Sequence, residues 1–224
     1  MIIKTRISAL WLSLHPFSFV SCNPIGHTAS YHMMKFREDQ YYIGEVLKGD
    51  VNAFEPLVRK HQDLVFSIVR RIVKTPEDAE EIAQDVFLKA YRKLGKFKGE
   101  SRFSTWLYRI AYNTAVSHGR KKKTVFVPAG EDQSEHMPDT EIDREIMGLS
   151  VEEQGKLIRD ALSVLPATEN LIICLYYYHR KDIREIGKII GMTETNVKVK
   201  LYRIRKKMLK EMNNMMSREE YSVA

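Results

Sequence analysis

Aromatic and basic side chains alternate in the stretch between Gly95 and Lys123. Eight Lys or Arg residues occur there against a single acid, Glu100. The aromatic residues among them are Phe97, Phe103, Trp106, Tyr108 and Tyr112. Cations bind phosphates, and aromatic rings stack on unpaired bases with about 1–3 kcal/mol for each base. The stretch therefore has the side chains needed to hold a single strand of nucleic acid.

Helical spacing divides these residues between two faces of a helix. Phe103 and Trp106 lie on its apolar stripe, so we expect both in the core. The residues that fall toward the other face are expected to be free to contact a ligand, and they are Tyr108, Arg109, Tyr112 and Asn113.

A second basic surface lies near the C-terminus. The last expected helix carries a row of cations on or beside its exposed side: Lys198, Lys200, Arg203, Arg205, Lys206, Lys207 and Lys210. In a major groove, residues near the start of such a helix reach base edges and later residues contact phosphates. This surface suits duplex DNA, although a solvated basic face is the plainer interpretation.

Carboxylates form a third cluster, on the helix before the aromatic stretch: Glu77, Asp78, Glu80, Glu81 and Asp85. Such a cluster could hold Mg²⁺ as in a nuclease, which would use Glu77, Asp78 and Glu81. No His or Lys is placed by the sequence to act as its acid or base. A solvated face and a docking surface for a basic protein are the other two interpretations.

Helices must position these clusters, because no useful run of alternating residues predicts a strand. Apolar residues at helical spacing predict a helix within residues 51–73. Thr75 is placed to cap the next helix, Pro76 fits its first position, and that helix ends near Gly95. A short loop over residues 96–102 then leads into the aromatic helix.

The C-terminal part predicts a helix-turn-helix. Two apolar helices separated by Pro166 come first, and an Asp-x-x-Glu capping box from Asp182 opens a short helix. Gly191 gives a tight turn and Thr193 caps the last helix. The apolar face of that helix consists of Val197, Leu201, Ile204 and Met208. A short helix, a Gly turn and a basic helix are the elements of this DNA-binding motif.

Composition limits the class of protein. The 224 residues carry a formal charge of +7, which favours a polyanionic partner. Two cysteines, with no His at metal spacing, exclude a disulfide framework and an ordinary zinc finger, so we expect a cytoplasmic protein with no metal and no cofactor. Nine acids and one base between Glu131 and Glu153 indicate a linker. Residues 1–33 imitate a signal sequence, and we expect a disordered extension or a start misassigned ahead of Met33.

Two segments and the C-terminal motif together resemble one family. Residues 78–91 (DAEEIAQDVFLKAY) resemble the core-polymerase-binding helix of bacterial sigma factors. Residues 97–113 (FKGESRFSTWLYRIAYN) resemble their segment that melts promoters and reads the −10 element. The helix-turn-helix is similar to their −35-reading domain. With no other sigma domain present, the resemblance is to the extracytoplasmic-function (ECF) class.

The resemblance implies a role for each cluster. The residues implied to dock on the clamp of the polymerase β′ subunit are Asp78, Glu81, Gln84 and Asp85. Those implied to contact the −10 element, with a pocket for one flipped-out base, are Phe97, Lys98, Ser101, Arg102, Phe103, Thr105, Tyr108, Arg109, Tyr112 and Asn113. Those implied to contact the −35 element are Thr193, Lys198, Val199, Lys200, Tyr202, Arg203 and Lys206.

The expected fold class is therefore all-α, with two small helical domains joined by a flexible acidic linker. We expect an extension over residues 1–33, a region 2-like domain over 34–123, the linker over 124–155, a helix-turn-helix domain over 156–212 and a tail over 213–224. The implied partners are core RNA polymerase (β′ clamp and β subunits), promoter DNA in duplex and single-stranded form, and an anti-sigma factor. The resemblance also implies a protein that does not insert into a membrane. It implies no enzymatic activity, because the polymerase does the chemistry.

Two residues depart from the family pattern. Val199 stands where a small polar residue is common, so the −35 preference can differ. Gly187 stands where Ala is usual, which lowers the helix propensity by about 1 kcal/mol. The alternative function is a stand-alone helix-turn-helix regulator, which would leave the aromatic stretch and the acidic helix without a role.

Overall fold

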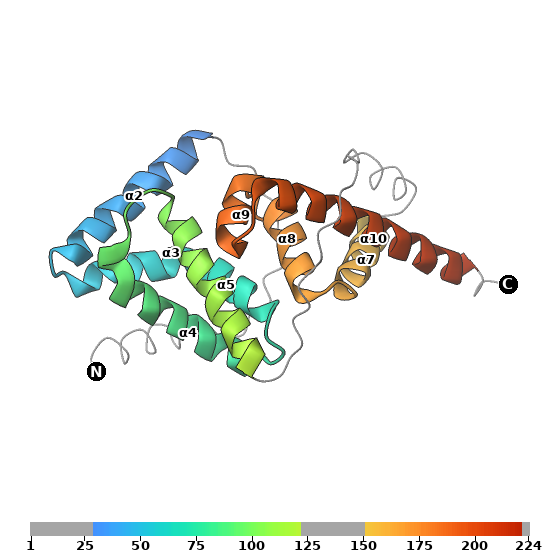
Figure 1. Cartoon of the computed structure of the whole chain (residues 1–224), viewed down its shortest axis with the longest axis horizontal. Helices are drawn as coiled ribbons and strands as arrows, with labels where there is room; N and C mark the ends of the chain where they lie inside the picture. The colour runs from blue at the N-terminus through green and yellow to red at the C-terminus, as the bar shows by residue number, and fades with distance from the viewer. Residues whose placement is uncertain (1–28, 122–150, 221–224) are drawn as a thin grey trace. The chain divides into compact units, whose positions relative to one another are not determined.

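The computed structural model describes residues 29–121 and 151–220, and within them every regular element is a helix (Figure 1). The chain divides into two compact units, residues 1–126 and residues 127–224, apart from the short stretch 188–191, which groups with the first. The all-α prediction is confirmed. The expectations for residues 1–28 and for the linker from 122 to 150 lie outside the described residues.

The first unit consists of α2 (Ala29–Leu47), η1 (Val51–Ala53), α3 (Phe54–Arg70), α4 (Pro76–Lys93), η2 (Leu94–Lys96) and α5 (Phe103–Lys121). Helices α3, α4 and α5 pack against one another around fully buried side chains that include Leu57, Ile68, Phe87 and Phe103. The start of α4 is as predicted: Pro76 is its first residue, and Oγ1 of Thr75 accepts a hydrogen bond from the Asp78 amide at 3.2 Å.

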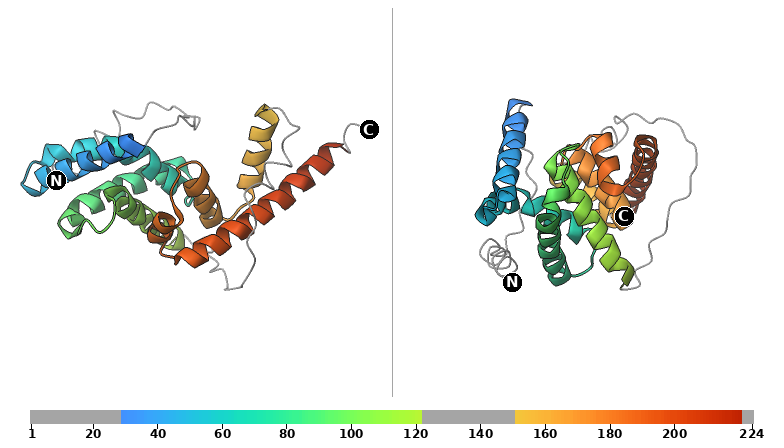
Figure 2. Two further views of the ribbon diagram at one scale, coloured as in Figure 1. Left: turned by 90° about the horizontal axis from the view of Figure 1, so that it is seen from above. Right: turned by 60° about the vertical axis from the view of Figure 1, so that its left-hand side comes forward.

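The second unit consists of α7 (Val151–Ser163), α8 (Ala167–Tyr177), α9 (Ile183–Ile190) and α10 (Glu194–Glu220). Helix α7 begins inside the segment predicted as linker, and α10 runs eight residues past Met212, where the sequence placed the end of the domain. Figures 1 and 2 show α10 as one continuous helix with α7 beside its C-terminal half.

Helices α9 and α10 form the predicted helix-turn-helix. Oδ1 of Asp182 accepts from the Glu185 amide at 2.6 Å, and Oγ1 of Thr193 accepts from the Asn196 amide at 3.2 Å. Both caps are those expected from the sequence. Between the helices, Gly191 adopts a positive φ of 77° and closes α9.

Gly187 is needed by this turn. The Met192 amide donates to the Gly187 carbonyl at 2.9 Å, which folds the turn back over the helix. A Cβ atom at position 187 would lie only 2.7 Å from the Met192 carbonyl oxygen. The propensity lost by having glycine here therefore accompanies a backbone approach that alanine would obstruct.

Candidate nucleic-acid interface

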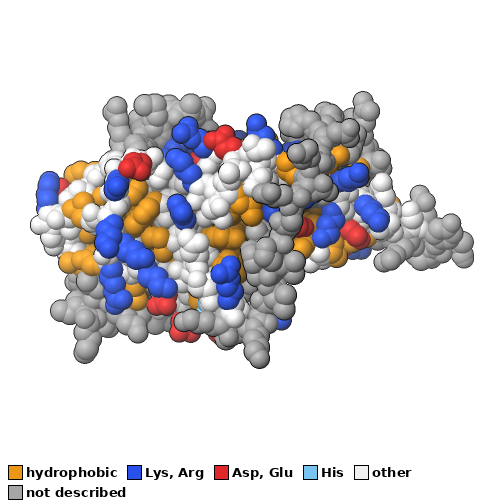
Figure 3. Space-filling model, in the orientation of Figure 1, with side chains coloured by type: hydrophobic (Ala, Val, Ile, Leu, Met, Phe, Trp, Pro, Cys, Tyr) orange, Lys and Arg blue, Asp and Glu red, His pale blue; other side chains and the backbone are white. Residues whose placement is uncertain are grey.

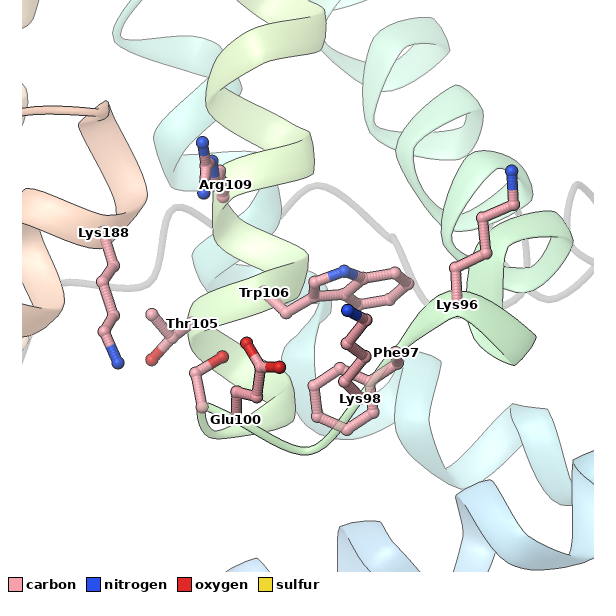
Figure 4. Close-up of a pocket in the computed structure, with 9 residues that line it drawn as sticks. Lys96, Phe97, Lys98, Glu100, Thr105, Trp106, Arg109 and Lys188 are labelled. Atoms are coloured by element: carbon pink, nitrogen blue, oxygen red, sulfur yellow. The ribbon is translucent and has the colours of Figure 1, made fainter.

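A pocket opens between the 96–101 loop and the start of α5 (Figure 4). The residues of this loop and of α5 that line the pocket are Lys96, Phe97, Lys98, Glu100, Ser101, Thr105, Trp106 and Arg109. Gly99, with φ of 73°, lets the loop turn at this point. The loop and the helix thus place one acid and three cations around a common hollow.

Aromatic rings form one wall of this pocket. The Phe97 and Trp106 ring centroids lie 5.3 Å apart, and each ring also contacts Phe103, at 5.8 and 5.7 Å. Phe103 is fully buried, as the sequence predicts, whereas Trp106 is half-buried and faces the pocket. The expectation that Trp106 belongs to the core is wrong, and its ring is placed where an unpaired base could stack.

Two tyrosines predicted to contact a ligand are instead buried. Tyr108 is 5% exposed and Tyr112 is 6% exposed, so the expectation that they are free on an outer face is wrong. The reason is that α5 packs on both α3 and α4, which buries a wider face than one apolar stripe. The Tyr108 hydroxyl lies 3.1 Å from Nδ1 of His61, so its polar end is satisfied inside the unit.

The remaining predicted −10 residues divide by exposure. Lys98, Arg102, Arg109 and Asn113 are exposed, and Phe97 and Ser101 are half-buried at the pocket. Phe103 and Thr105 are buried, so Phe103 acts behind the pocket wall. Three pocket residues of this loop and helix were not among the predicted −10 residues: Lys96 and Glu100 in the loop, and Trp106, which was expected in the core.

Basic side chains spread over the face of the first unit seen in Figure 3, with hydrophobic side chains between them. Such a face attracts phosphates without regard to sequence, while a pocket among the cations can select a base. The combination therefore fits a single strand with one base turned out of the stack.

Helix α4 carries the acidic cluster on its solvent side. Its inner face is buried through Ile82, Val86 and Phe87, whereas Glu81 and Asp85 are exposed. Asp78 and Gln84 are half-buried at the edges of the same surface. In the described part of the chain, no three His, Cys, Asp or Glu residues lie close enough together to hold a metal ion. The carboxylates are therefore spread along the helix instead of converging as in a nuclease site.

Helix α10 presents the predicted basic face. Its apolar side is buried as expected, through Val197, Leu201, Ile204 and Met208. Of the predicted −35 residues, Thr193, Lys198 and Lys206 are exposed, and the half-buried ones are Val199, Lys200, Tyr202 and Arg203. Thr195 and Asn196 are also exposed in the first turn, the part of such a helix that reaches base edges, and the sequence analysis did not select them.

Arg205 is held in place by tyrosines of α8. Its guanidinium lies 5.5 Å from the Tyr176 ring centroid and 5.7 Å from that of Tyr177, and its Nε donates to the Tyr177 hydroxyl at 2.9 Å. These contacts fix α10 to α8 through a cation–π stack. No helix among the described residues is long and apolar enough to cross a membrane.

Comparison with known proteins identifies both units. The family model "Sigma-70 region 2" matches residues 57–125, and "Sigma-70, region 4" matches residues 155–208. The ECF RNA polymerase sigma-E factor of Escherichia coli (strain K12) is 34% identical over 173 residues, covering 75% of this chain and 90% of that protein. The ECF RNA polymerase sigma factor SigW of Bacillus subtilis (strain 168) is 29% identical over 193 residues, covering 77% and 96%. The RNA polymerase sigma-H factor of Pseudomonas aeruginosa is 45% identical over 86 residues, covering 38% of this chain and 45% of that factor.

Solved structures share the fold. CnrH in complex with the cytosolic domain of CnrY aligns with a TM-score of 0.54 at 19% identity, covering 79% of this chain and 98% of CnrH. The sigma factor RpoE of Bartonella quintana, in complex with the anti-sigma factor NepR, aligns with a TM-score of 0.53 at 20% identity, covering 73% and 98%. Both domain models, the sigma-E and SigW alignments along most of the chain, and the fold agree: the chain belongs to the ECF class of RNA polymerase sigma factors.

Proposed function

We propose that this chain is a promoter-specificity factor, which binds core RNA polymerase, recognises the −35 and −10 elements and helps to melt the DNA. The observation that supports it best is the pairing of two different nucleic-acid surfaces in one chain. One is a pocket with an aromatic wall and cations around it, and the other is the basic helix of a helix-turn-helix. A stand-alone duplex-binding regulator needs only the second.

The pocket is proposed to take one flipped base of the −10 element. Trp106 and Phe97 offer ring faces for stacking, and Lys98 and Arg109 lie where the flanking phosphates would pass. Unstacking a base costs a few kcal/mol, so a pocket that repays this cost for one base couples recognition to melting. Arg102 and Asn113 are proposed to contact the same strand from its exposed side.

The acidic side of α4 is proposed to dock on the β′ clamp of the polymerase. Glu81 and Asp85 are exposed one helical turn apart, with Asp78 and Gln84 beside them. Opposite charge steers two proteins together and fixes their register. The β subunit is proposed as a further contact on the polymerase.

The start of α10 is proposed to read the −35 element. The residues proposed to contact base edges are Lys198, Val199, Tyr202 and Arg203, and those proposed to contact phosphates are Lys200 and Lys206. Thr193 caps the helix, so its side chain orders the end that enters the groove.

Two further proposals concern where the chain acts and what restrains it. CnrH was solved in complex with the cytosolic domain of CnrY, and RpoE in complex with the anti-sigma factor NepR. We propose by analogy that an anti-sigma factor binds this chain. We place the protein in the cytoplasm with the polymerase, and we assign the chemistry of RNA synthesis to the polymerase alone.

Reconstituted transcription tests the function. Sheared genomic DNA is transcribed by core polymerase with and without the protein, and the RNA starts are mapped. Starts that need both components and share two upstream boxes are the expected result. If the protein adds no starts but retards duplex DNA by itself, the stand-alone regulator is the correct function.

A further inference from the structure

Three helices of the first unit meet at a buried charged cluster that lies behind the pocket. Asp39 comes from α2, His61 from α3 and Tyr108 from α5, and all three side chains are nearly inaccessible. Lys60 reaches the same cluster from α3, with its Nζ 2.7 Å from Oδ1 of Asp39. Buried charge is costly unless each group is paired, so this cluster needs an explanation beyond packing.

Both ring nitrogens of His61 have a partner in the cluster. Nε2 of His61 lies 3.2 Å from Oδ2 of Asp39, and Nδ1 lies 3.1 Å from the Tyr108 hydroxyl. A carboxylate can only accept, so Nε2 carries a hydrogen and donates it to Asp39. Nδ1 forms the second bond of the ring, to the Tyr108 hydroxyl, which can donate or accept. Each polar end of the imidazole is thereby fixed by a different helix.

Asp39 is charged in this setting. Burial raises its pKa, but the hydrogen bond from His61 and the charges of His61 and Lys60 outweigh burial, so the pKa lies below its ordinary value. The anion holds the imidazole in one orientation, as a carboxylate does for a histidine that must point in a fixed direction. The Tyr108 hydroxyl is buried, so the chain of groups ends inside the protein and not at a substrate.

A row of rings connects the cluster to the pocket. The His61 ring lies 5.6 Å from the fully buried Phe103 ring and 5.9 Å from the Tyr108 ring. Phe103 in turn contacts both Phe97 and Trp106, which form the pocket wall. Well-packed rings cannot shift singly, so these contacts give His61 a packing route through Phe103 to the pocket wall.

We propose that Asp39, His61 and Tyr108 are positioning residues for the base pocket, and that they act through Phe103 on Phe97 and Trp106. This inference rests on the proposed function, because it assumes that the pocket holds a base. It also connects α2, which lies outside both sequence motifs, to −10 recognition. A cluster that served stability alone would leave the geometry of the pocket wall unchanged when one hydroxyl is removed.

The test uses the full chain carrying Trp11→Phe, which leaves Trp106 as the only tryptophan. Tyr108→Phe removes the hydroxyl and keeps the ring. Tyr91→Phe is the matched control, because Tyr91 packs on Phe54 at 5.2 Å, away from the cluster. The readouts are Trp106 emission with acrylamide quenching in the free protein, and the anisotropy of fluorescein-labelled dA, dC and dT 12-mers.

The expected result is a shift in Trp106 emission and quenching for Tyr108→Phe, with affinity for the preferred 12-mer reduced about fivefold and unchanged helical circular dichroism. Tyr91→Phe should match the parent in all three. If Tyr108→Phe unfolds, His61→Gln and His61→Leu replace it: Gln keeps a donor toward Asp39, so it should preserve emission and affinity better than Leu.

Trp106→Ala separates the two hypotheses. Loss of 12-mer binding in Trp106→Ala, together with parental emission and affinity in the folded Tyr108→Phe and His61→Leu variants, would overturn the positioning role and leave the base pocket standing. If Trp106→Ala binds as the parent does, the base pocket fails. In that case, Trp106 emission in the Tyr108→Phe and His61→Leu variants without DNA still shows whether the cluster positions the rings of the pocket wall.

Discussion

The cores of the two units differ in chemistry. Every buried polar or charged side chain of the described residues, namely Asp39, His61, Ser104 and Thr105, lies in the first unit. The described core of the second unit is built from apolar side chains such as Leu171, Ile186 and Met212. Both units nevertheless expose a basic surface.

The difference follows from what each surface is proposed to hold. A duplex is contacted by the exposed face of a helix, and that helix needs only an apolar core on its other side. A single flipped base needs a hollow of fixed shape, and directional hydrogen bonds fix shape better than apolar packing does. The first unit contains the buried cluster, whereas the Lys181–Glu185 pair of the second unit is looser, at 3.8 Å, with side chains 11% and 15% exposed.

The largest expected effect concerns the acidic surface of α4 in the first unit. The double variant Gln84→Ala with Asp85→Ala should weaken binding to core polymerase by a hundredfold or so, since central interface residues often cost 2 kcal/mol or more. A pull-down titration against core polymerase measures it, with Glu55→Ala on α3 as the control. Binding equal to the parent's would remove the docking role from α4.

A second substitution tests the stability of the buried cluster. Asp39→Asn should lower the free energy of unfolding of the first unit by about 3 kcal/mol at pH 7, because it leaves His61 and Lys60 beside a neutral group. The folded pKa of Asp39 is depressed, so its contribution is present above the unfolded pKa and is lost as pH falls through the folded pKa.

Urea unfolding followed by Trp106 fluorescence, in the Trp11→Phe background, measures this effect. The difference between the parent and Asp39→Asn should shrink as the pH falls below about 4. A difference of the same size at pH 7 and pH 3.5 would show that charge on Asp39 contributes nothing.

The basic surface of the second unit is tested by Arg203→Ala. If Arg203 reads a base edge, the variant should lose roughly 1–3 kcal/mol of discrimination at one position of the −35 element. Holoenzyme binding to promoter variants, repeated at two salt concentrations, measures it. A loss that is equal on all sequences and depends on salt would make Arg203 a phosphate contact instead.

The smallest expected effect compares two glycines of the second unit. Gly187→Ala should destabilise the helix-turn-helix by about 1 kcal/mol, because its Cβ would meet the Met192 carbonyl oxygen. Gly155→Ala, in α7, should stabilise by up to about 1 kcal/mol, because its Cβ meets only the end of the Arg159 side chain, at 3.2 Å. Hydrogen exchange of peptides from residues 155–212 measures both. Changes of the same sign in the two variants would contradict this reading of the turn.

Local chemistry made much of the fold predictable. Thr75, Asp182 and Thr193 each cap the helix that the sequence assigned to them, because a cap depends on a residue and its neighbours three positions away. The two basic surfaces were predictable for a similar reason, since the cations and rings of each are close together in the sequence.

Contacts across the fold were not predictable. Spacing along α5 could not show that two helices cover it, so Tyr108 and Trp106 were assigned to the wrong faces. The Asp39–His61 pair joins residues 22 positions apart on different helices, and no local sequence pattern predicts it. Gly187 read as a weak helix position because the Met192 carbonyl that approaches it belongs to the turn.

The continuity of α10 has a mechanical consequence. Its 27 residues extend for about 40 Å, so the turn that follows Thr193 and the half that packs on α7 belong to one continuous helix. Met212 is fully buried and lies in the C-terminal half of α10, far from Thr193. A change in the packing between α7 and α10 is therefore expected to move side chains several turns away along α10, although it makes no contact with them. The packing of α7 against the C-terminal half of α10 therefore affects how precisely the side chains near Thr193 are positioned.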